Sequence, residues 1–98
     1  MAAYVVVHVN IQDPSWLAEY IPKTEALIHK HGGRYLVGGG AEMEVLEGDT
    51  PLPSGIVLLE FPSTEQAKAW YNDPEYAPMI TLRQTGSSAD LVVVENKG

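Results

Sequence analysis

Four short apolar segments, each too short for a typical helix, are spread along the chain. They are rich in valine, leucine and isoleucine, as buried strands usually are. Their positions are residues 4–11 (YVVVHVNI), 34–38 (RYLVG), 56–61 (IVLLEF) and 89–95 (ADLVVVE). Residues 42–47 (EMEVLE) alternate apolar and acidic side chains, and this period of two predicts a further, half-exposed strand.

Residues 13–31 have the spacing of an amphipathic helix, with apolar side chains at every third or fourth position. Asp13 suits the N-cap of this helix, and Pro14 suits its first turn. Pro22 lies inside the pattern, where it removes one backbone hydrogen bond. We therefore expect the helix to be kinked or split at Pro22.

A second helical region follows residues 56–61. Ser63 is a suitable N-cap, and Gln66 three residues later completes a capping-box pattern. An Asp-Pro pair at residues 73–74 begins another helical stretch, which ends near Gly86. The helical layer is therefore expected to contain two segments after the third strong strand.

The order of these elements predicts the fold class. Two β-α-β units joined by a β-β link form a ferredoxin-like βαββαβ sandwich, an α+β fold with an antiparallel sheet and its helices on one face. No repeat, low-complexity tract or change of composition divides residues 1–98. We expect a single domain.

The strands indicate how the chain assembles. In an antiparallel sheet with one wet face, apolar and polar side chains should alternate. Along residues 4–9, however, Val5, Val7 and Val9 point one way, and the other face also receives apolar side chains. Because helices can cover only one face, a second copy of the sheet is the simplest cover for the other. The pattern predicts a homodimer in which two sheets form an α/β barrel.

Charge and composition limit the possible partners. Six lysines and arginines against thirteen acidic residues give a formal charge of −7. Nucleic acids and anionic membranes are held mainly by basic side chains, so neither is expected as a partner. No apolar run approaches the roughly 20 residues of a membrane helix, and there are no cysteines. These features predict a cytoplasmic protein with no disulfide framework.

The stretch HKHGGRYLVGGG, residues 29–40, raises the question of a metal or phosphate site. On a helix, His29 and His31 diverge by about 200° and cannot grip one ion together, so no metal is expected. A dinucleotide fingerprint needs its glycines between a strand and a following helix, whereas Gly32 and Gly33 follow a helix. Gly32 fits the left-handed position that ends a helix, and a bulge or close backbone contact explains residues 38–40. No cofactor is expected.

Two segments carry a family resemblance. HGGRYLVGGG with VLEG, and LLEFPSTEQAKAWYNDPEY followed by LRQ and DLVVVE, resemble the bacterial family known as domain of unknown function 1330. The resemblance covers nearly the whole chain, and residues 60–76 are its most specific part. It implies a dimeric α/β barrel and no particular reaction, because the family has no established activity. Related barrels include cofactor-free monooxygenases, lactone isomerases and haem-handling enzymes, which is an analogy of fold alone.

One position departs from that family's pattern. Members usually carry arginine where this chain has Gly38. If that arginine anchors an anionic ligand in relatives, the anchor is missing here, which weakens any transfer of ligand class.

Two titratable residues are candidates for catalysis. His8 lies within an apolar strand, where burial would keep the imidazole neutral and able to exchange a proton near pH 7. Glu60 ends another apolar strand and is expected to reach solvent or to pair with Arg34 or Arg83. On a shared face, His8 and Glu60 would make an acid/base pair. A structural histidine and an ion pair are the alternative roles.

Aromatic and basic residues on the helices and the second strand are candidates for ligand binding. Aromatic rings line pockets for flat apolar ligands, although they also fill cores and interfaces. An arginine at the rim of such a pocket can bind a carboxylate, or can form a surface or interchain salt bridge. The ligand-binding candidates are Tyr20, Arg34, Trp70, Tyr71, Tyr76 and Arg83. Glu42 and Glu44 share one side of the weak strand and are interpreted as a solvated face.

Three functions remain open at this point. The first is a homodimer that binds a small organic ligand between sheet and helices. The second is a cofactor-free enzyme, monooxygenase-like or isomerase-like, acting on a small apolar or aromatic substrate. The third is a non-catalytic regulatory or structural dimer. A ligand-binding protein should contain a cleft lined by the aromatic residues, whereas a purely structural dimer should pack them without space.

Overall fold

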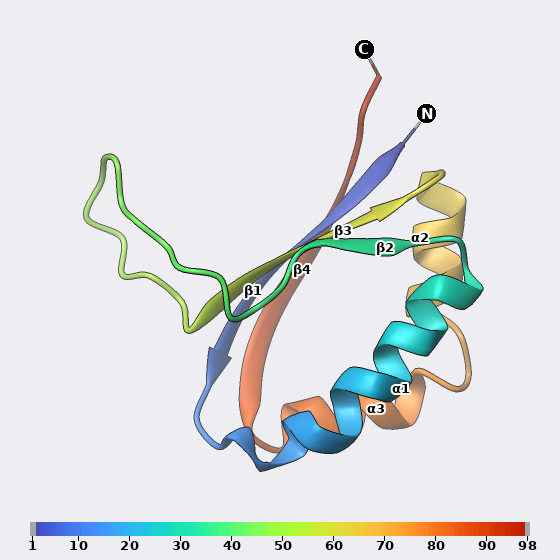
Figure 1. The fold of residues 1–98 in the computed structure, drawn as a ribbon, viewed down its shortest axis with the longest axis horizontal. Coiled ribbons are helices and arrows are strands. Elements are labelled where there is room, and N and C mark those ends of the chain that lie inside the picture. The colour runs from blue at the N-terminus through green and yellow to red at the C-terminus, as the bar shows by residue number, and fades with distance from the viewer. Residues whose placement is uncertain (1, 98) are drawn as a thin grey trace.

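Four strands form one antiparallel sheet in the computed structural model of the chain, which describes residues 2–97 (Figure 1). The strands are β1 (Ala3–Ile11), β2 (Arg34–Val37), β3 (Gly55–Phe61) and β4 (Ser87–Glu95). Their order across the sheet is β2-β3-β1-β4, which is the order of a ferredoxin-like sandwich. The predicted fold class is therefore confirmed.

Helices cover one face of this sheet. They are α1 (Leu17–Lys30), α2 (Thr64–Tyr71) and α3 (Ala77–Gln84), and a 3-10 turn at Pro14–Trp16 precedes α1. Asp13 accepts a hydrogen bond from the Ser15 N–H at 2.9 Å and so caps the 3-10 turn, whereas α1 itself begins after Trp16 without a side-chain cap. The helix α1 continues through Pro22, so of the two expected outcomes the split is wrong and the kink stays a prediction. Pro22 is exposed in the second turn of α1, where its ring faces solvent and the remaining backbone hydrogen bonds hold the helix together.

The glycine signal after α1 and the serine cap of α2 are confirmed, whereas Gln66 uses its side chain differently from the predicted capping box. Gly32 has a φ of 82° just after α1 ends, a left-handed conformation that favours glycine. Ser63 Oγ accepts a hydrogen bond from the Gln66 N–H at 3.2 Å and caps α2. The Gln66 side chain does not return to its own helix; its Nε2 donates to the His31 carbonyl at 3.2 Å. Gln66 thus satisfies the end of α1 and links α1 to α2.

The connection between β2 and β3 contains no regular strand, so the predicted strand at residues 42–47 is wrong. Val45 is 46% exposed and Leu46 is 96% exposed. The apolar side chains of this segment therefore pack neither in the core nor against a partner strand. At the base of this connection, a Cβ on Gly55 would lie 2.6 Å from the Gly39 carbonyl oxygen. The close backbone contact predicted for residues 38–40 is therefore confirmed.

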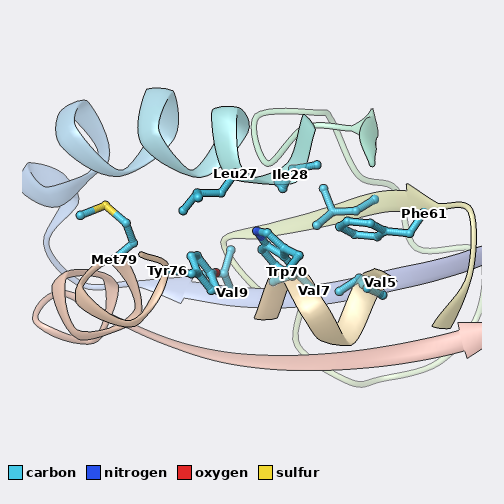
Figure 2. Packing of buried hydrophobic residues seen from close by; sticks show 11 residues of the cluster. Val5, Val7, Val9, Leu27, Ile28, Phe61, Trp70, Tyr76 and Met79 are labelled. Atoms are coloured by element: carbon cyan, nitrogen blue, oxygen red, sulfur yellow. The ribbon is translucent and has the colours of Figure 1, made fainter. Parts of the chain in front are cut away.

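The hydrophobic core lies between the helices and the inner face of the sheet. Figure 2 shows Val5, Val7 and Val9 of β1 directed toward the helical layer, with Trp70 and Tyr76 packed above them. From the other elements, the largest fully buried side chains include Phe61, Ile28 and Thr24. The inner side of β1 is therefore covered within a single chain.

The opposite face of the sheet, here called the outer face, is apolar but has no helix above it (Figure 1). At its centre, Val6 of β1 lies opposite Leu58 on one side and Val92 on the other. Val92 is 58% exposed and Val94 is 50% exposed. At one end of the sheet, the Asn96 N–H donates to the Ala2 carbonyl at 2.9 Å and extends the pairing of the first and last strands. The two-sided apolar pattern predicted from the strands is present.

Candidate functional site

A cleft of about 380 Å³ lies where α2, α3 and β4 meet. Apolar and polar side chains both contribute to its lining, and residues of both charge signs are among them. The lining residues are Val5, Ala67, Lys68, Trp70, Tyr71, Asn72, Arg83, Gln84, Ala89, Asp90, Leu91, Val92 and Val93. A cleft of this volume suits a small organic molecule.

The cleft exists because the helical layer leaves part of β4 uncovered. α2 packs on β1, β3 and β4, whereas α3 packs on β4 and on α1. On the inner side of β4, Ala89 and Leu91 are half-buried and Val93 is 37% exposed, although the same side of β1 is fully buried. The inner side of β4 therefore forms an apolar floor that no side chain of residues 2–97 covers completely.

A series of aromatic rings links the cleft to the interior. Trp70 and Tyr76 have ring centroids 4.6 Å apart, and Tyr71 packs edge-on against both rings. The Tyr76 hydroxyl shares a hydrogen bond of 2.6 Å with the Tyr20 hydroxyl. Trp70 and Tyr76 are fully buried, but Tyr71 is 43% exposed at the cleft. Tyr71 is therefore the ring of this group that a ligand can reach directly.

Arg83 contributes a buried positive charge to the wall of the cleft. The residue is only 6% exposed, and its Nε atom has no hydrogen-bond partner. Its Cα lies in the last turn of α3, where the negative end of the helix dipole favours a cation. The helix dipole therefore stabilises the guanidinium charge in part. It does not provide a hydrogen-bond acceptor for Nε.

Burial keeps the Tyr76 and Tyr35 hydroxyls protonated. Burial, followed by the effects of Tyr20, raises the pKa of Tyr76 well above its usual range, and the nearby Arg83 guanidinium offsets this only in part. Burial also raises the pKa of Tyr35 to about 12, and the neighbouring Tyr20 and Glu25 add to this shift. Both phenols are therefore neutral hydrogen-bonding groups near pH 7.

The stretch that follows α1 forms a structural joint. His31 Nε2 donates to Asp73 Oδ2 at 2.8 Å, and Lys30 Nζ donates to the same oxygen at 3.0 Å. Asp73 Oδ1 accepts from the Glu75 N–H at 2.8 Å. These bonds, with that of His31 first, hold the pKa of Asp73 well below its usual range. The cluster fixes the end of α1 to the link between α2 and α3.

The two catalytic candidates do not meet. His8 and Glu60 do share the outer face, but Glu60 lies opposite Tyr4, four residues before His8 along β1. At about 3.3 Å per residue, this separation is about 13 Å along the strand, too far for direct proton exchange. His8 is exposed, so the burial expected for it is absent in the single chain. Glu60 instead accepts a hydrogen bond from Arg34 Nε at 2.8 Å, as expected for an ion pair.

The ligand-binding candidates fall into two groups. Trp70, Tyr71 and Arg83 line the cleft, and Tyr76 and Tyr20 stand behind them. Arg34 lies apart, on the outer face with Glu60. The sequence did not indicate that Ala89 and Leu91 form the floor of a cleft, because the other strands are equally apolar. It also did not connect Asp73 with His31, since no local signal links positions 42 residues apart.

Among residues 2–97, no group of three or more histidine, cysteine, aspartate or glutamate side chains is placed to hold a metal ion. Over the same range, none of the helices has both the length and the apolar character needed to cross a membrane.

Comparison with known proteins places the chain in a family. Residues 2–97 match the family described as "Domain of unknown function (DUF1330)", and the chain belongs to this family. No protein with a curated description matches it.

Solved structures show the same fold at low sequence identity. A protein of unknown function from Rhodopseudomonas palustris has a TM-score of 0.76 and 18% identity, over 99% of this chain and 83% of its own. SnoaB, a cofactor-independent oxygenase from Streptomyces nogalater, has a TM-score of 0.65 and 11% identity, over 99% and 94%. A putative antibiotic biosynthesis monooxygenase from Nitrosomonas europaea has a TM-score of 0.62 and 14% identity, over 100% of both chains. At such identities the likeness concerns the fold.

Proposed function

We propose that this protein is a homodimer that binds a small organic ligand in the cleft between α2, α3 and β4. The observation that carries the proposal is the cleft itself, an apolar floor on β4 beside an exposed tyrosine ring and a buried arginine. Convergence of a few polar groups on an apolar hollow is the usual form of a small-molecule site. We further propose that residues 1–98 form one domain and act in the cytoplasm.

The dimer is supported by the outer face. Val6, Val92 and Leu58 form an apolar centre that one chain leaves in contact with water. Soluble proteins rarely leave such a patch uncovered, and a two-fold partner presents the same patch in return. Because each chain carries a charge of −7, two copies repel at long range, so apolar burial has to provide the attraction.

Ligand binding is proposed ahead of catalysis. His8 and Glu60, the two candidates for acid/base chemistry, project from the face opposite the cleft. Neither can therefore reach a ligand that lies on the inner side of β4. One neighbour in fold is a cofactor-independent oxygenase, which supports the enzyme alternative only as an analogy of fold.

A cleft-filling variant tests the proposal. Ala89→Trp places an indole on the floor of the cleft, and Ala41→Trp in the exposed connection serves as a matched control. A panel of small aromatic and aliphatic compounds, neutral and acidic, is screened by thermal unfolding. A ligand at ten times its Kd stabilises the native state by about 1.4 kcal/mol, which raises the Tm of a domain of this size by roughly 5–10 °C.

We expect the wild type and Ala41→Trp to be stabilised by the same compounds, and Ala89→Trp to keep its fold by circular dichroism but lose the response. A panel that stabilises none of the three proteins, or a response that survives in Ala89→Trp, contradicts a ligand site in this cleft. Light scattering of the wild type tests the dimer separately, because a folded single-chain particle at micromolar concentration contradicts it.

A further inference from the structure

Arg83 is a buried cation without an acidic partner. Among residues 2–97, ion pairs are formed by Lys23, Lys30, His31 and Arg34, and none of them includes Arg83. Lys30 and Arg34 are largely exposed and still have carboxylates beside them, whereas the guanidinium that water reaches least has none. Its Nε–H is shielded from solvent and has no acceptor.

This arrangement is costly for the free chain. An arginine stays protonated in a protein, so it cannot escape burial by losing its charge. A buried charge normally requires an opposite charge and hydrogen bonds to offset its lost hydration. Arg83 does hydrogen-bond to the Tyr76 side chain, but this phenol is neutral and supplies no negative charge. The guanidinium therefore has unused capacity for an anion.

The surroundings of Arg83 specify the rest of the ligand. Arg83 lies in the wall of the cleft, Ala89 and Leu91 form its apolar floor, and the Tyr71 ring forms an exposed aromatic side. A molecule with an anionic end and a flat apolar body matches this arrangement. Trp70 also has an unpartnered nitrogen, but Figure 2 shows the indole nitrogen on the side facing α1, so Arg83 is the donor relevant to the cleft.

We propose that the cleft takes a small monocarboxylate with an aromatic or aliphatic body, and that Arg83 pairs with its carboxylate. This inference rests on the proposed function and names the ligand class of the same site. Guanidinium and carboxylate match each other as a planar fork that makes two parallel hydrogen bonds, and Arg83 contributes to the lining of the cleft.

The charges around the cleft favour one negative charge over two. The whole chain carries −7, so its long-range field repels anions, and only a nearby shielded cation attracts them. Lys68, the other cation that lines the cleft, is exposed to solvent, which screens its charge. A second carboxylate on the ligand would lie in this cleft without a second buried cation. A dicarboxylate is therefore expected to bind more weakly.

Matched ligands and the arginine itself provide the test. The probes are phenylacetate, benzoate and hexanoate, each compared with its neutral primary amide, and phenylsuccinate as the dianion. Binding is followed by the ¹⁵N–¹H signal of the Arg83 side-chain Nε in the wild type and by thermal shift in the variants Arg83→Gln and Arg83→Lys. Arg34→Gln, which removes an exposed arginine on the outer face, is the control.

We expect at least one monocarboxylate to shift the Arg83 Nε signal and to bind at least tenfold more tightly than its amide and than phenylsuccinate. Arg83→Gln should reduce the preference for acid over amide to about twofold, and Arg34→Gln should leave it unchanged. If Arg83→Gln does not fold, Arg83→Lys and the wild-type Nε signal decide the question. Lysine keeps the charge but loses the fork, so we expect an intermediate preference.

Three results would overturn the inference. Amides that bind as tightly as acids would refute the role of Arg83 while leaving a ligand site in the cleft intact. Absence of binding by acids and amides alike would refute both proposals. An Nε signal that changes on dilution of the protein and ignores the ligands would show that an acidic group of a second copy pairs with Arg83.

Discussion

Leu58 and Leu59 are neighbours on β3 and point to opposite faces of the sheet. Leu59 faces the helices and is 2% exposed, whereas Leu58 faces outward and is only half-buried. The same contrast separates Val5 on the inner face from Val92 on the outer face, at 4% and 58%. The two faces thus have similar side chains, but only one of them is covered by helices. Side-chain type predicts that both faces need to be buried, and the arrangement of the helices decides which face is buried within one chain.

The largest expected effect separates the two leucines. Leu59→Ala removes a fully buried side chain and should lower the free energy of unfolding by about 2–5 kcal/mol, because a cavity remains. Leu58→Ala should cost about 1 kcal/mol in the separated chain, and more as dimer forms. Urea unfolding at several protein concentrations measures both penalties. Equal penalties at every concentration would contradict a difference in cover between the faces.

The next effect concerns assembly. Val92→Lys adds a charge to the outer face beside Val6, where the proposed dimerisation would bury it without a partner. We expect dimer dissociation to become at least about 100-fold easier, equivalent to roughly 2.7 kcal/mol, with circular dichroism unchanged. Light scattering across a dilution series measures this, with Leu46→Lys in the exposed connection as the control. An unchanged dimer in Val92→Lys would place the interface elsewhere.

A smaller, pH-dependent effect concerns Asp73, which joins the helices that cover the inner face. Because the folded chain holds the Asp73 pKa below its unfolded value, the stabilisation from this carboxylate is complete above about pH 4. It is lost as the pH falls below that value and through the folded-state pKa. We expect Asp73→Asn to lower the Tm at pH 7 and to reduce the loss of Tm between pH 5 and pH 2.

Asp49→Asn, in the exposed connection, is the matched control for this titration. Parallel acid-unfolding curves for the wild type and Asp73→Asn would mean that the joint between α1 and the α2–α3 link contributes nothing to pH-dependent stability.

The smallest expected effect belongs to the ion pair of the outer face. Arg34 and Glu60 lie 2.8 Å apart, but the arginine side chain is 67% exposed, so solvent screens the pair. A double-mutant cycle with Arg34→Gln and Glu60→Gln should give a coupling below about 1 kcal/mol. A coupling of several kcal/mol would show that water is excluded from this ion pair. The proposed dimer interface would then include β2.

Elements that depend on local signals could be predicted from the sequence. The valine-rich strands, the Ser63 cap and the left-handed Gly32 each follow from a few adjacent residues. The strand predicted at residues 42–47 was wrong because alternation indicates a strand only when another strand pairs with it. The split predicted at Pro22 was wrong for a related reason, since the effect of a proline on a helix depends on how firmly the neighbouring turns are held.

The site was only partly accessible to sequence reasoning. The aromatic residues and Arg83 were identified individually as candidates, but their common cleft depends on how far α2 and α3 cover β4. Arg83 is buried without an acidic partner only because of how the helices pack on the sheet. No pattern of neighbouring residues in the sequence indicates this. Distances between separate elements therefore limit what a single sequence can reveal about function.

The pairing of the first and last strands at one end of the sheet also affects how the chain can be rebuilt. Since the Asn96 N–H meets the Ala2 carbonyl, a short flexible linker could join these ends. New termini could then be opened in the exposed connection at residues 38–54, where the backbone takes no part in the sheet. Such a circular permutant would keep all four strands, their order and the cleft, so the path of the polypeptide could be altered without altering the site.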